Sequence, residues 1–164
     1  MENQSGRGSA SSEIHQLFAA DRKDRVDFAK GASLGLEIRQ RDEQRLQKAK
    51  EIAARGGISD PQDLNRLAFI FQHGDSVADY RQALGLTTQA VAAGLPPQDS
   101  IIPHVTDRLM IQEQLDANIP LHEVKQKFGT QTRFDETGNP FKPKLDGTAT
   151  QEEFEKFGIE QHEG

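Results

Sequence analysis

The amino-acid sequence predicts a mainly α protein: a compact helical domain with a short C-terminal hairpin or extended loop. Three observations support this prediction. Apolar residues recur at helical spacing over most of the chain, glycines and prolines stand where these stretches end, and the pattern changes only after Phe128. Hydrophobic residues make up 34% of the 164 residues, which fits one domain with a modest core.

The composition argues against several classes of protein. The chain has no cysteine, which rules out a disulfide framework and a thiolate zinc site, and its net charge of −6 argues against a nucleic-acid partner. No apolar run approaches the roughly 18 residues of a membrane span, and the first residues lack the apolar core of a signal peptide. We therefore expect a soluble, cytoplasmic protein without a membrane partner; the sequence does not determine its oligomeric state.

The chain is expected to begin with a disordered lead-in that two helices follow. Residues 1–12 are polar, small and rich in Gly and Ser, so they bury too little surface to offset the entropy of ordering. Ser12 is the expected N-cap of a first helix whose apolar stripe starts at Ile14. A second helix is predicted over 36–55, and Gly56-Gly57 is its stop signal.

Further helices are predicted in the middle of the chain. The clearest start signal is Ser59-Asp60-Pro61, where a capping side chain precedes a proline at the first helical position. The helix that follows is expected to end by Gly74, and others are predicted over 76–93 and 100–115. A short helix is also predicted over 121–128.

The last part of the chain has a different pattern. Thr130, Thr132 and Phe134 alternate with polar residues, and 136–139 is typical of a turn, so we predict a small hairpin or ordered loop. Thr150-x-x-Glu153 is a capping-box pattern that predicts a final helix, which Gly158 ends. The expected layout is a lead-in at 1–12, a single helical domain at 13–158 and a tail at 159–164.

The segment Gln72-His73-Gly74-Asp75 is the first candidate for chemistry. It follows an apolar helix, and such a junction often points side chains into a cleft. His73 has a side chain that exchanges protons near neutral pH, and Asp75 is placed to orient its ring, so both are candidate catalytic residues. The alternative is that His73 only caps the carbonyls at the end of that helix.

The second candidate is Thr106-Asp107-Arg108, which lies among apolar residues. Asp107 is a candidate catalytic residue that would hold either His73 or its neighbour Arg108. The planar guanidinium of Arg108 is suited to binding a carboxylate or phosphate of a substrate. The alternative is an internal ion pair that fixes two helices against each other.

The third candidate is the run from Gln126 to Gln131. Gln126, Thr130 and Gln131 supply neutral donors and acceptors around a glycine that permits a sharp turn, which suits them to bind a small polar substrate. The alternative is that these side chains only stabilise a loop.

No cofactor or metal ion is predicted. The sequence has no HExxH pair, no Walker loop, no GxGxxG and no GxSxG elbow. A less favoured alternative is a metal site in which His104 and Asp107, one helical turn apart, share a ligand with His73 and Asp75.

These three motifs, in this order, resemble a widespread family of small, mainly bacterial proteins known as a domain of unknown function. Its members carry Gln-His-x-Asp at a helix end, then Asp-Arg, then Gln-x-Tyr/Phe-Gly-Thr-Gln. The N-terminal segments Asp24-Arg25 and Asp42-x-x-Arg45 also resemble the family. Here Phe128 replaces the more common tyrosine, and the connection over 112–124 is longer than is typical. The resemblance implies that the motifs converge on one site, but it does not imply a reaction.

Three functions follow from these residues. The favoured one is an enzyme without a cofactor that acts on a small polar or anionic molecule, in which His73, Asp107, Arg108 and Gln131 meet in space. The second is a non-catalytic ligand-binding or interaction module, in which the same residues form a structural polar network. The third is a metal-dependent hydrolase.

Overall fold

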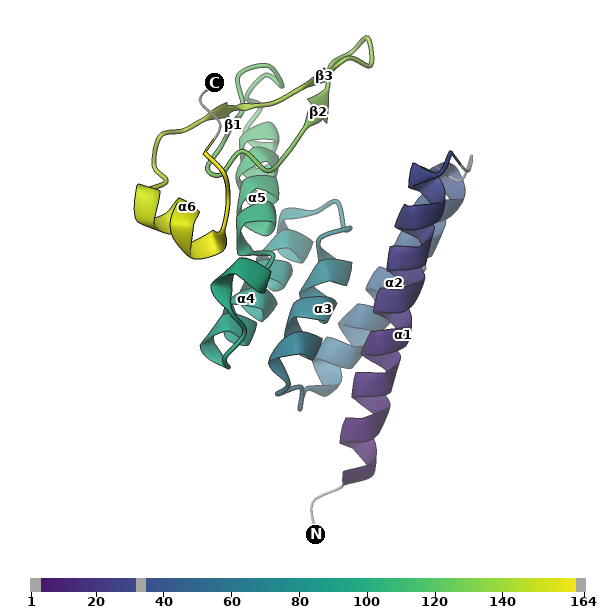
Figure 1. Cartoon of the computed structure of the whole chain (residues 1–164). Coiled ribbons are helices and arrows are strands. Elements are labelled where there is room, and N and C mark those ends of the chain that lie inside the picture. Colours follow the sequence, from purple (N-terminus) through teal and green to yellow (C-terminus); the bar gives the residue numbers. More distant parts are fainter. Residues whose placement is uncertain (1–3, 32–34, 162–164) are drawn as a thin grey trace.

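The computed structural model describes residues 4–31 and 35–161, and this part of the chain is mainly helical. Helices α1 (Gln4–Ala29) and α2 (Gly35–Arg55) lie side by side along one flank of the molecule (Figure 1). The other helices are α3 (Pro61–Phe71), α4 (Val77–Ala92), the short 3-10 helix η1 (Pro97–Asp99), α5 (Ile102–Asp116) and α6 (Gln151–Phe157). Helix α3 contacts α1, α2 and α4, and α4 in turn packs against α5.

The starts of α3 and α4 follow from local capping. Asp60 accepts a hydrogen bond from the backbone N–H of Asp63 at 3.0 Å, directly before Pro61. Ser76 caps α4 in the same way, accepting from the N–H of Asp79 at 3.1 Å. The helix predicted from Ser59-Asp60-Pro61 and the helix predicted over 76–93 are therefore confirmed.

The hydrophobic core lies where α3, α4 and α5 meet. It is built largely from small or branched side chains that let the helices approach closely. Its fully buried members include Leu67, Ala68, Ala83, Ala90 and Val105, and Ile14, Ala49 and Ile52 extend it to α1 and α2. Within the described ranges, no helix is both long and apolar enough to cross a membrane.

The first helix begins earlier than the sequence predicted. Helix α1 already includes Gln4. The expectation of a disordered lead-in, with an N-cap at Ser12, is therefore corrected for residues 4–12, which are helical. Residues 1–3 lie outside the described ranges. The cause is tertiary. Ser11 Oγ donates to Asp63 Oδ2 of α3 at 2.6 Å, and Ala10 packs against the core. These contacts stabilise a helical turn that the composition by itself does not favour.

The C-terminal part forms short strands and one more helix. Strands β2 (Arg133–Phe134) and β3 (Pro140–Phe141) pair in an antiparallel hairpin, as predicted. Strands β1 (Lys125–Gln126) and β4 (Lys144–Leu145) form a parallel pair that the sequence did not predict. The predicted capping box of α6 is present, with both reciprocal hydrogen bonds between Thr150 and Glu153, and Gly158 ends the helix in the left-handed region at φ 63°.

The short helix predicted over 121–128 is not formed. The side chain of Gln114 on α5 instead holds Lys125, accepting from its N–H at 2.9 Å and donating to its carbonyl at 2.8 Å. The backbone N–H groups of Lys127 and Phe128 point to Asp107, at 2.7 and 2.8 Å. Because these backbone groups are used by α5 side chains, they are not available for helical hydrogen bonds.

Candidate active site

His73 lies in the turn that ends α3. Its N–H donates to the carbonyl of Ile70 at 3.2 Å, and the N–H of Gly74 donates to that of Phe71 at 3.0 Å. Position 74 needs a glycine because a Cβ there would lie 2.6 Å from the Cβ of Asp79. The close approach of this turn to α4 fixes the backbone on both sides of the histidine.

The carboxylate beside His73 comes from α1. Asp21 is fully buried, and its Oδ1 lies 3.2 Å from Nε2 of His73 and 3.4 Å from Nη2 of Arg25. Neither carboxylate oxygen accepts an aligned hydrogen bond from any described residue. Burial by itself raises the pKa of this carboxyl, but neighbouring His73 and the Arg25 guanidinium outweigh burial, and the pKa of Asp21 lies below its ordinary value.

Further charged side chains surround this pair. Asp24 and Arg25 lie one turn along α1 from Asp21, because residues three and four apart share a helix face. From α2, Arg45 donates to Asp24 at 2.8 Å and to Asp42 at 2.6 Å. Arg25 also donates to Asp42 at 2.6 Å. We call Asp21, Asp24, Arg25, Asp42, Arg45 and His73 the charged cluster.

A cavity of about 480 Å³ opens beside the charged cluster. Arg25, Asp42 and His73 contribute polar wall, and Phe28, Ile38 and Leu46 contribute apolar wall. Asp75 also lines it, but its side chain is 87% exposed and lies 3.7 Å from Arg39. The expectation that Asp75 or Asp107 orients His73 is thus corrected: the carboxylate in that position is Asp21.

Asp107 has a different role in the structure. It is fully buried on α5 and accepts four hydrogen bonds from the loop after β1. These come from the N–H groups of Lys127, Phe128 and Thr130 and from the hydroxyl of Thr130, at 2.7–2.8 Å. One carboxylate therefore organises a whole turn of the chain.

The glutamines of the third motif complete this loop. The fully buried Gln126 donates to the carbonyls of Gln131 and Pro143 at 3.2 and 2.8 Å, and accepts from the N–H of Gln131 at 2.9 Å. Gln131 in turn donates to the hydroxyl of Thr130 at 3.1 Å. Since these groups already bond each other, the structure favours the loop-stabilising alternative for them, and their role in substrate binding stays a prediction.

A second cavity, of about 930 Å³, borders this loop. Gln126 and Thr130 line it together with the rings of Phe128 and Phe154. The two rings meet edge to face with centroids 6.0 Å apart. His104, the histidine of the alternative metal site, also lines this cavity. In the described ranges, no three His, Asp or Glu side chains are grouped closely enough to hold a metal ion.

Arg108 lies at the end of α3, near His73. Although it follows Asp107 in sequence, it faces the end of α3, where its Nη1 lies 3.5 Å from the carbonyl of Gln72. The four residues expected to meet are thus divided: His73 and Arg108 adjoin the end of α3, while Asp107 and Gln131 belong to the loop network. That all four contact one bound molecule stays a prediction.

Sequence reasoning assigned no site role to Asp21, Arg25, Asp42 or Arg45. A signal for them exists in the chain, because acidic and basic residues recur at three- and four-residue spacing within two consecutive helices. Such spacing is also common on solvated helix faces, so only the packing of α1 on α2 shows that these side chains are turned inward.

No protein-family model matches the chain, and neither a curated protein nor a solved structure is detectably similar to it.

Proposed function

We propose that the chain is an enzyme that uses His73 as an acid/base residue on a small polar molecule bound in the 480 Å³ cavity, without a cofactor for that step. The observation that carries this proposal is the buried carboxylate of Asp21, 3.2 Å from the histidine ring. A buried, ionised group lowers the stability of the folded protein unless it is compensated, and such groups are concentrated in active sites.

The proposed roles of Asp21 and His73 follow from the position of the histidine ring. Asp21 faces Nε2 of His73, so it orients the ring and stabilises the imidazolium when the histidine takes up a proton. Nδ1 is then the nitrogen that exchanges a proton with the substrate. The apolar residues in the wall, among them Phe28 and Leu46, exclude water from one side of the bound molecule.

The test is a comparison of variants in an extract of small metabolites followed by mass spectrometry. The wild type and the control His122→Gln, which alters a histidine whose side chain is 81% exposed, should consume the same compound. His73→Gln should lower the rate about 10²–10⁴-fold while keeping its helical circular-dichroism spectrum. Asp21→Asn should lower it as well. If every compound consumed by the wild type is consumed equally fast by His73→Gln, the proposal is wrong.

A non-catalytic binding module is the second candidate. The closed network around Asp107 and Gln126 favours it, because those side chains serve the fold and leave no polar group for chemistry. In that case the same extract should show retention of a compound without its conversion, and His73→Gln should change affinity but no rate.

A further inference from the structure

Arg108 is a half-buried cation with no acidic partner among the residues that the structure describes. Its Nε is buried and lacks a hydrogen-bond acceptor, its Nη1 makes a long 3.5 Å contact to the carbonyl of Gln72, and the side chain of Tyr80 is its one further polar partner in the described ranges. No carboxylate of a described residue lies within ion-pair distance of it. Arg25 and Arg45 provide the contrast, since each of these arginines contacts two aspartates.

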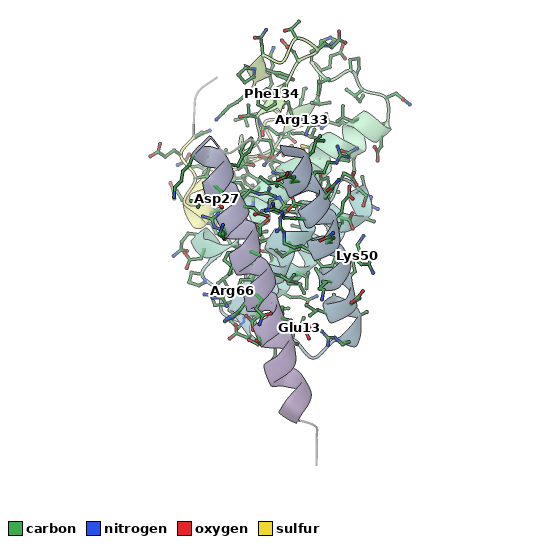
Figure 2. All side chains as sticks on the ribbon, turned by 90° about the vertical axis from the view of Figure 1, so that its right-hand side faces the viewer. Glu13, Asp27, Lys50, Arg66, Arg133 and Phe134 are labelled. Atoms are coloured by element: carbon green, nitrogen blue, oxygen red, sulfur yellow. The ribbon has the colours of Figure 1, made fainter. Side chains whose placement is uncertain are left out.

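Two other arginines act on the charge of Arg108. Burial lowers the pKa of its guanidinium, and the charges of Arg133 and Arg25 lower it further, while Tyr80 acts in the opposite direction. Arg133 lies on β2, and Figures 1 and 2 show this strand at the same end of the molecule as the C-terminal end of α1. The charges of β2 and α1 thus act on Arg108 although these elements lie far from α5 in sequence.

An uncompensated cation in such a place is unfavourable for folding. A buried charge without a partner is strongly unfavourable, so buried charges in proteins are paired with an opposite charge or bound to an ion. The planar fork of a guanidinium matches the two oxygens of a carboxylate or phosphate. A bound oxyanion would supply both the missing acceptor for Nε and the missing negative charge.

We propose that Arg108, whose buried Nε has no acceptor, binds the oxyanion of a small carboxylate or phosphate ester, and that the positive charge of Arg133 adds to the attraction. This site adjoins His73, because Arg108 contacts the residue before the histidine and Arg25 contacts its partner Asp21. The identification of this anion as part of the substrate rests on the proposed function. The binding of an anion does not, and it is tested separately.

The experiment measures the melting temperature with increasing inorganic phosphate, and in parallel with acetate, at constant ionic strength. Arg22→Gln is the matched control, because Arg22 is an exposed arginine on α1. The wild type and this control should be stabilised by at least one of the two anions. Arg108→Gln should lose that stabilisation, with apparent affinity at least about tenfold weaker, as expected when a charge-assisted hydrogen-bonding partner is removed. General salting effects of phosphate act equally on all variants and cancel in this comparison.

Two further variants test the anion site independently of Arg108→Gln and separate it from the proposed function. Arg133→Gln should weaken the response partly, which also tests the site if Arg108→Gln fails to fold. His73→Gln should keep the full response even where turnover is lost, so a failure of the anion site and a failure of the proposed function are distinguishable. A preference for phosphate identifies a phosphate ester, and a preference for acetate identifies a carboxylate. If the wild type responds to neither anion, or Arg108→Gln and Arg133→Gln respond as it does, the anion site does not exist.

Discussion

Asp107 and Arg108 are adjacent in sequence but have opposite environments. Successive residues of a helix point about 100° apart, so the two side chains contact different neighbours. Asp107 accepts four hydrogen bonds from one loop. Arg108 has a long contact to a backbone carbonyl, Tyr80 beside it, and no counter-charge among the described residues. Asp107 therefore stabilises the fold, whereas Arg108 is the residue that we propose binds a ligand.

Replacing Asp107 should therefore destabilise the protein strongly. Asp107→Ala leaves the buried N–H groups of the loop without an acceptor, and we expect the free energy of unfolding to fall by about 3–5 kcal/mol. Urea denaturation measures this loss. Asp116→Ala, at the exposed end of the same helix, is the control and should change stability by less than about 0.5 kcal/mol. A loss no greater than that of the control would contradict the prediction.

The pairing of α1 with α2 depends on charge as well as on apolar packing. The buried residues of α2 are Ile38, Arg45, Ala49 and Ile52, so an arginine occupies one position of an otherwise apolar stripe. Arg45 is 7% exposed and Asp24 is 5% exposed. Burial lowers the pKa of Arg45, but Asp42 and Asp24 outweigh it and raise that pKa above its ordinary value. The two helices are thus held in one register by a buried ion pair.

Removing one partner of this ion pair should lower the free energy of unfolding more than replacing both partners with apolar residues. Arg45→Met leaves the buried Asp24 with only the half-exposed Arg41 as a partner, at 2.6 Å, and we expect a loss of about 2–3 kcal/mol in the free energy of unfolding. Combining it with Asp24→Leu should recover part of that loss, and a double-mutant cycle in urea denaturation measures the coupling. Arg55→Met, which breaks the exposed pair with Glu13, should cost less than about 1 kcal/mol. Equal losses of unfolding free energy in Arg45→Met and Arg55→Met would contradict this prediction, because the buried and the exposed ion pair would then contribute equally to stability.

Considered as a whole, the molecule has an apolar centre with polar networks on both sides. Helices α3, α4 and α5 form the centre, the charged cluster joins α1 and α2 to it on one side, and Asp107 and Gln126 join the C-terminal strands to it on the other (Figure 1). Because α1 contacts this body through buried carboxylates, its attachment depends on their ionisation.

Stability should consequently fall in acid. The pKa values of Asp21 and Asp24 are lower in the folded protein than their ordinary value of 3.8, although burial opposes the shift. The unfolded chain therefore binds protons first, so the stabilisation is complete above the unfolded pKa and is lost as pH falls through the folded values. The free energy of unfolding should decline below about pH 4, and more gently in Asp24→Asn. Asp99→Asn, which alters an exposed aspartate, should follow the wild-type profile; a profile for Asp24→Asn as steep as the wild type would refute this account.

The sequence by itself determined what depends on neighbours a few residues away. Asp60, Ser76 and Thr150 cap their helices through residues three positions on, so these starts were predictable. The mainly helical fold class and the β2–β3 hairpin were predictable for the same reason. The turn at the end of α3 was also predictable from Gly74, and so was the position of His73 in that turn.

Only the tertiary structure decided which side chains meet. The partner of His73 is Asp21, from a helix that begins the chain, and no local pattern distinguishes that aspartate from the exposed Asp75. The parallel β1–β4 pair and the helical turns around Ser11 likewise depend on contacts between distant segments. The physical reason is that a charged residue at helical spacing fits a solvated face and a buried one equally well, until the packing of α1 and α2 excludes water from one of them.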